Sequence, residues 1–174
     1  MTGFDFNAAN IEFSRECLGV EIRAEQFSEA DLPTESVDIV FMCHSLEHTP
    51  FPMQYIEKAY DCLKPGGVFS CFVPNFSSLC SIEQGDNWFW LDPDDHYFHF
   101  TPRTLYESWV EVGFEVLAKR LMTFNESQYE GKNPLQYLRE IYPWVADDET
   151  DRLVTLYRWI GLGDHLPILG IKVR

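Results

Sequence analysis

The sequence predicts an α/β domain built on a mainly parallel sheet. Strand and helix patterns alternate through the first two thirds of the chain, and the apolar runs 37–43 and 68–73 are nearly continuous, as in strands covered on both faces. Strands that alternate with helices favour parallel pairing through right-handed crossovers. The 174 residues, 45% hydrophobic and 16% aromatic, are enough for one domain with a sizeable core.

The first third of the chain predicts a helix between two strands, followed by a third strand. Asn7 is placed to cap a helix over 8–18, and Gly19 ends it. Residues 20–27 alternate enough to form a strand. The buried run 37–43 then forms the next strand.

The middle of the chain continues the alternation. Proline in the first turn starts a helix that runs from about residue 50 to Leu63. The stretch 64–67, Lys-Pro-Gly-Gly, stops that helix in a tight turn. The buried strand 68–73 follows it.

The last third predicts a helix, a strand, further helices and a final strand. Thr101 caps a helix that Gly113 ends, and 114–122 reads as a strand. Helices at about 125–162 precede the last strand at 166–173. We expect the last strand to be antiparallel, because the two late strands can include the antiparallel pair that is common at the edge of such sheets. Together these elements predict a Rossmann-like domain.

Charge and composition exclude several classes of partner. Lys and Arg total 13 against 28 Asp and Glu, a formal net charge of −15. This excess repels nucleic acid and anionic membranes, so we expect neither as a partner. The sequence shows no signal peptide and no apolar run long enough to span a bilayer. Five cysteines without a CxxC pattern suit a reducing compartment, and we expect a cytoplasmic protein.

Polar residues follow the first two predicted strands. Ligands bind such sheets at the carboxyl ends of the strands. Asp5 ends the first strand, where a carboxylate can accept hydrogen bonds from both ribose hydroxyls of a nucleotide. It can equally be an acid that the dipole of the following helix favours. Glu25, Gln26 and Phe27 end the second strand.

Histidines follow the third strand and recur later in the chain. Imidazoles and a carboxylate that could hold a metal lie in two short stretches: His44, Glu47, His48, His96 and His99. The HExxH pattern is absent, and Pro50 and Pro52 argue against a helix through the first stretch, so we expect no metal. An imidazole that accepts a proton beside a ligand is the favoured interpretation.

Aromatic residues are dense in 88–90 and 96–100. Such density is ordinarily a core or an interface patch. The alternative is a pocket wall over a small apolar or aromatic substrate, and the sequence leaves both open.

Read together, these stretches resemble the class I S-adenosylmethionine-dependent methyltransferases. The resemblance rests on the order and spacing of several short motifs, which are Gly3-Phe4-Asp5, 32–40, His44-Ser45-Leu46-Glu47-His48, Leu63-Lys64-Pro65-Gly66-Gly67, Val73-Pro74-Asn75, 95–102 and 113–116. The stretch 95–102 is similar to a subgroup related to ubiquinone-pathway and sugar- or polyketide-modifying enzymes. The resemblance covers roughly 3–122 and the last strand.

The resemblance implies S-adenosylmethionine as the cofactor and gives roles to particular residues. The cofactor-binding residues it implies are Asp5 on the ribose with Phe6 beside it, Gln26 and Phe27 (or Glu25) near the adenine, and Cys43 and His44 at the methionine end. The catalytic residue it implies is His48, which contacts the substrate or accepts its proton. The substrate-binding residues it implies are Trp90, His96 and His99.

The start of the chain departs from the family. The family's sheet runs in the order 3-2-1-4-5-7-6, and its first strand and Gly-rich loop belong upstream of Met1. We therefore expect one N-terminally incomplete, truncated domain over 1–174, with the helical insertion at about 125–162. The strands that flank the gap then either pair with each other or are covered by a second copy, as a homodimer through exposed sheet edges.

The expected activity is transfer of a methyl group to a small-molecule acceptor by in-line displacement. Alignment of the two reactants supplies most of the rate of this reaction. The alternative is a non-catalytic methyltransferase-like module for binding or assembly, which the departure at the start favours. A nicotinamide-dependent oxidoreductase also places an acid at a strand end. Such an enzyme needs a glycine loop between a strand and a helix, and neither glycine pair of this sequence occupies that position.

Overall fold

A computed structural model describes residues 1–118 and 165–173. Its helices and strands are β1 (Gly3–Phe4), α1 (Ala8–Phe13), β2 (Ile22–Arg23), β3 (Val37–Cys43), α2 (Pro52–Cys62), β4 (Leu63–Pro74), α3 (Leu79–Gln84), α4 (Pro102–Val112), β5 (Phe114–Ala118) and β6 (His165–Lys172). The predicted helices at 125–162 lie outside the described residues.

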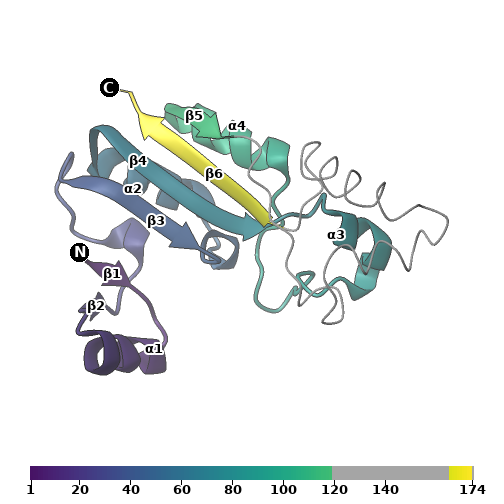
Figure 1. The fold of residues 1–174 in the computed structure, drawn as a ribbon, viewed down its shortest axis with the longest axis horizontal. Helices are drawn as coiled ribbons and strands as arrows, with labels where there is room; N and C mark the ends of the chain where they lie inside the picture. The colour runs from purple at the N-terminus through teal and green to yellow at the C-terminus, as the bar shows by residue number, and fades with distance from the viewer. Residues whose placement is uncertain (119–164, 174) are drawn as a thin grey trace, which may run out of the picture.

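The strands form two sheets (Figure 1). β1 and β2 form a parallel pair, and the larger sheet has the order β3-β4-β6-β5. β3 and β4 are parallel, whereas β6 runs antiparallel to both of its neighbours. This arrangement confirms the predicted α/β sheet with an antiparallel last strand.

β1 and β3 do not pair, so the prediction that these two strands close on each other is wrong. Side-chain packing ties the small sheet to the rest of the protein instead. The ring of Phe4 lies 5.5 Å from that of Phe27, and Phe27 lies 6.2 Å from Tyr55 of α2. The aromatic contacts of Phe27 thus connect β1 to α2, whereas β1 makes no strand pairing with β3.

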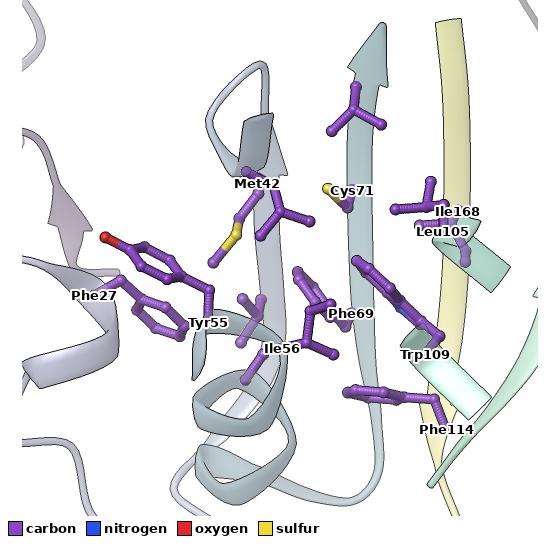
Figure 2. Packing of buried hydrophobic residues seen from close by; sticks show 14 of the residues in the cluster. Phe27, Met42, Tyr55, Ile56, Phe69, Cys71, Leu105, Trp109, Phe114 and Ile168 are labelled. Atoms are coloured by element: carbon purple, nitrogen blue, oxygen red, sulfur yellow. The ribbon is translucent and has the colours of Figure 1, made fainter. Parts of the chain in front are cut away.

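The core lies between the larger sheet and the helices α2 and α4 (Figure 2). Met42 of β3, Phe69 of β4 and Ile56 of α2 meet there. Trp109 of α4 is fully buried and stacks on Phe69 with ring centroids 4.7 Å apart. A Cβ at Gly170 of β6 would lie 2.8 Å from Trp109 Cδ1, so the close approach of α4 to β6 requires glycine.

The opposite face of β3 is exposed. Ile39 and Phe41 are 68% and 63% exposed, whereas Val40 and Met42 between and beyond them are buried. The prediction that 37–43 is covered on both faces is therefore wrong for the part of the chain that the structure describes. The physical reason is that α2 and α4 both pack on the same face, where their apolar residues share one core.

Local signals predicted most element ends correctly. The Asn7 side chain accepts hydrogen bonds from the amides of Ala9 and Asn10, and a π-helical turn continues α1 to Leu18 before Gly19, at φ +63°. The strand predicted at 20–27 is only Ile22–Arg23, because the chain turns into a 3₁₀ helix at Phe27–Glu29.

The sequence predicts a tight turn at 64–67 before the strand, whereas the structure includes this stretch in β4, which begins at Leu63. Val37 pairs with Leu63 and Ile39 with Val68, so 64–67 is an irregularity within β4. α4 begins with a capping box between Thr101 and Thr104. None of the helices described here is long and apolar enough to cross a bilayer.

Candidate functional site

All five histidines of the chain gather at one edge of the larger sheet. His44 follows the carboxyl end of β3, and its amide donates to the carbonyl of Phe72 on β4. β6 runs antiparallel, so it begins at the same edge, where His165 pairs with Pro74. The remaining three are His48 on the turn after His44, and His96 and His99 on the loop before α4.

Glu47 lies at the centre of this cluster and is fully buried. Its backbone carbonyl accepts hydrogen bonds from the amides of Tyr97 and Phe98, at 2.9 and 3.2 Å, which holds the loop before α4 against the turn after β3. Its Oε1 accepts a hydrogen bond from His44 Nδ1 at 3.2 Å. Its Oε2 is buried with no hydrogen-bond partner, which is costly for a carboxylate oxygen.

His48 and His96 each use Nδ1 on a backbone carbonyl. His48 Nδ1 lies 3.0 Å from the carbonyl oxygen of Asp95, and His96 Nδ1 lies 2.8 Å from that of Trp90. A carbonyl can only accept, so Nδ1 carries the proton in both rings, and Nε2 of each neutral ring is an open lone pair. The two rings meet edge to face at 4.6 Å.

Trp90 forms an aromatic wall between two histidines. Its ring stacks on His44 at 5.0 Å and on His96 at 5.9 Å. His165 meets the ring of His44 at 4.9 Å, and its burial, together with His44, lowers the pKa of His165 to about 4. His99 packs beside Phe76 at 5.4 Å. The dense aromatics therefore serve as packing and also line the polar cluster.

Asp5 follows β1, and both of its carboxylate oxygens hold the start of α1. Oδ1 accepts from the Asn7 amide at 2.8 Å, and Oδ2 accepts from Asn10 Nδ2 at 3.0 Å. These contacts agree with the interpretation of Asp5 as an acid at the start of a helix. Each carboxylate oxygen has a further lone pair, so the two hydroxyls of a ribose diol could still donate hydrogen bonds to it. Phe6 beside it is 64% exposed.

The other residues assigned to the cofactor lie in different surroundings. Gln26 Oε1 accepts a hydrogen bond from the Tyr55 hydroxyl at 3.1 Å, whereas Phe27 is only 9% exposed and belongs to the core. Cys43 is exposed at the end of β3, and desolvation and Glu47 raise the pKa of its thiol. Cys43 is therefore a neutral thiol near neutral pH and a weak nucleophile.

Sequence reasoning missed two members of this cluster. It weighed Glu47 only as a metal ligand and gave it no role, and it gave none to His165. The antiparallel last strand was a usable signal for His165, because its first residue then falls at the ligand-binding edge. His44 has φ +48°, an uncommon conformation for a residue other than glycine, and no sequence pattern signalled it.

Comparison with known proteins defines the family. The model of the family described as "Methyltransferase domain" matches residues 1–119, so the chain belongs to this family. A ubiquinone biosynthesis O-methyltransferase of Cereibacter sphaeroides is 28% identical over 136 residues, covering 72% of this chain and 55% of that protein.

Solved structures show the same fold. An S-adenosylmethionine-dependent methyltransferase of Thermotoga maritima superposes with a TM-score of 0.68 at 19% identity, covering 98% of this chain and 72% of that one. A Haloferax volcanii protein solved in complex with the Trm112 methyltransferase activator gives a TM-score of 0.62 at 17% identity, covering 99% and 72%. The chain spans about half the length of the curated ubiquinone O-methyltransferases that it matches.

Proposed function

We propose that this domain transfers a methyl group from S-adenosylmethionine to a small-molecule acceptor. The observation that carries the proposal is the polar edge of the sheet, where His44, Glu47 and His48 follow β3 in a chain of the methyltransferase family. Bound S-adenosylmethionine supplies an already activated methyl group, so the protein's task is mainly to align donor and acceptor.

The cofactor-binding part of the proposal centres on Asp5. Its carboxylate is held by Asn7 and Asn10, and we assign its remaining lone pairs to the two ribose hydroxyls. Phe6 and Gln26, with Phe27 behind them, are assigned to the adenine side. Cys43 and His44 are assigned to the methionine end of the cofactor.

We assign the methyl acceptor to the part of the sheet edge that is formed by the histidine cluster. His48 is about one-third exposed, and its Nε2 is the open lone pair, so this atom is the one assigned to take a proton from the acceptor. Trp90, His96 and His99 are assigned to hold an apolar or aromatic acceptor by stacking.

Calorimetry of the full chain with S-adenosylmethionine tests the proposal. The variant Asp5→Asn should bind at least about tenfold more weakly, because it loses the negative charge that strengthens two hydrogen bonds. Glu12→Gln removes the same charge from an exposed position of α1 and should bind as tightly as the unaltered chain. Equal affinity in all three proteins would remove Asp5 from the proposed site.

The second candidate is a binding or assembly module that does not itself catalyse. The exposed Ile39 and Phe41 favour it, because a sheet face of this kind commonly marks an interface. The Haloferax volcanii neighbour, which was solved with an activator protein, is in keeping with assembly. Under this candidate a second copy of the chain covers the exposed edge and face of β3 as a homodimer. Absence of S-adenosylmethionine binding by the folded chain would favour it over the first.

A further inference from the structure

The histidine cluster contains a group of side chains whose acceptor atoms face one another. One ligand atom from each of Glu47, His48 and His96 lies within 4.8 Å of the other two. Glu47 Oε1 and His48 Nε2 are 4.0 Å apart. Two imidazole lone pairs and a carboxylate oxygen at such distances repel one another unless a proton or a metal ion lies between them.

The hydrogen bonds around this triad leave the Nε2 atoms of His48 and His96 free, whereas Glu47 Oε1 also accepts a hydrogen bond from His44 Nδ1 at 3.2 Å. His48 and His96 each donate Nδ1–H to a backbone carbonyl, at 3.0 and 2.8 Å. Histidines that bind metals nearly always use their second nitrogen in this way, which fixes the ring and raises the basicity of the ligating nitrogen. Both rings are therefore oriented before any ion binds.

Glu47 supplies an independent observation. Its side chain has no exposed surface, and its Oε2 has no hydrogen-bond partner. Leaving a buried carboxylate oxygen unpaired is unfavourable, and metal coordination is one of the few ways to compensate it.

We propose that Glu47, His48 and His96 bind one divalent transition-metal ion, with zinc as the best-fitting ion. Two imidazoles and one carboxylate form the donor set of open tetrahedral zinc sites, whereas magnesium and calcium prefer oxygen ligands throughout. The proposal departs from the sequence-based expectation of no metal. The sequence could not bring the three residues together, because His96 is distant in the chain and joins the other two through the loop contacts of Tyr97 and Phe98 with Glu47.

The geometry requires a small contraction. Ligand atoms about 2.1 Å from a tetrahedral zinc lie roughly 3.4 Å apart. The ligand atoms of the triad lie within 4.8 Å of one another, so the most distant pair must approach by at most about 1.4 Å. Rotation of the side chains can supply this movement. A fourth position remains for water or a donor atom of a ligand. His48, being partly exposed, lies on the open side of the site.

The test of the site does not depend on methyl transfer, because metal affinity is measured without donor or acceptor. The Nε2 lone pair of His48 can hold either the ion or a proton from the acceptor, so the two proposed roles belong to the metal-bound and the metal-free chain.

Competition with a chromogenic chelator tests the site. The full chain, purified without a polyhistidine tag and freed of metal by EDTA dialysis, is titrated with Zn²⁺. We expect one ion per chain, and an affinity lowered by about tenfold or more in His48→Asn, His96→Asn and Glu47→Gln. The cobalt(II) form should show the visible absorption of a four- or five-coordinate site with nitrogen ligands.

His99→Asn is the matched control, because His99 belongs to the same cluster, with its ring 6.0 Å from that of His96, but not to the triad. It should bind zinc within about threefold of the unaltered chain. Circular dichroism checks that each variant is folded, and the partly exposed His48 provides a test even if the His96 variant unfolds. Absence of a stoichiometric ion in the folded chain, or equal losses in the His99 and His48 variants, would overturn the proposal.

Discussion

At the scale of single residues, His165 is a buried group whose pKa is strongly lowered. It is 7% exposed, and burial lowers its pKa from 6.5 to about 4. The unfolded chain therefore takes up this proton at a higher pH than the folded protein does. The stability that the neutral ring contributes is complete above pH 6.5 and is lost as the pH falls towards 4.

Replacement of His165 by glutamine should reduce the acid sensitivity of the protein. Urea unfolding in EDTA at a series of pH values gives the free energy of unfolding of both proteins. Between pH 6.5 and 4 the unaltered chain should lose more stability than His165→Gln, and above pH 7 the two curves should run parallel. Parallel curves across the whole range would contradict the assigned pKa.

At the scale of elements, α4 is fixed to the sheet mainly by Trp109. The side chain is fully buried, stacks on Phe69 of β4 and fits against Gly170 of β6. The same helix begins at the Thr101 capping box and ends at Gly113, so its limits depend on local chemistry, whereas its position depends on the burial of Trp109 and Leu105 in the core.

Trp109→Ala should destabilise the fold by about 3–5 kcal/mol, because it removes the largest fully buried side chain among the described residues and leaves a cavity beside Phe69. Val110→Ala on the same helix is the control. Val110 is 46% exposed, so its truncation should change the free energy of unfolding by about 0.5 kcal/mol or less. Similar losses in both variants would show that α4 does not depend on the Trp109 contact.

At the scale of the whole molecule, two features oppose each other. The exposed apolar side chains of β3 favour association, whereas a net charge of −15 on each copy disfavours it. Salt screens the repulsion and leaves the apolar contact intact. Self-association through this face should therefore strengthen as the salt concentration rises.

Light scattering at micromolar concentration tests the proposed homodimer. The unaltered chain should give a dimer mass in high salt, and the double variant Ile39→Lys with Phe41→Lys should give a monomer mass. Glu57→Lys, at an exposed position of α2, changes the net charge by the same amount and should remain dimeric. A monomer mass for the unaltered chain at every salt concentration would exclude the homodimer.

Several structural features could be predicted from the sequence because each depends on neighbours in the chain. Asn7, Gly19, Thr101 and Gly113 mark helix ends through hydrogen bonds or backbone angles within a few residues. The apolar run 37–43 determined β3, and the order of short motifs determined the family and the sheet. The short β2 was overestimated, because alternation alone does not show where pairing stops.

Only the tertiary structure decided how the site is assembled and which faces are covered. The sequence located four histidines and the strand ends, but it could not show that Glu47 is buried among them or that His96 closes the triad with His48. It also could not show that α2 and α4 share one face of the sheet and leave Ile39 and Phe41 exposed. Burial and proximity between distant segments arise from packing, whereas local pattern determines only the elements that pack.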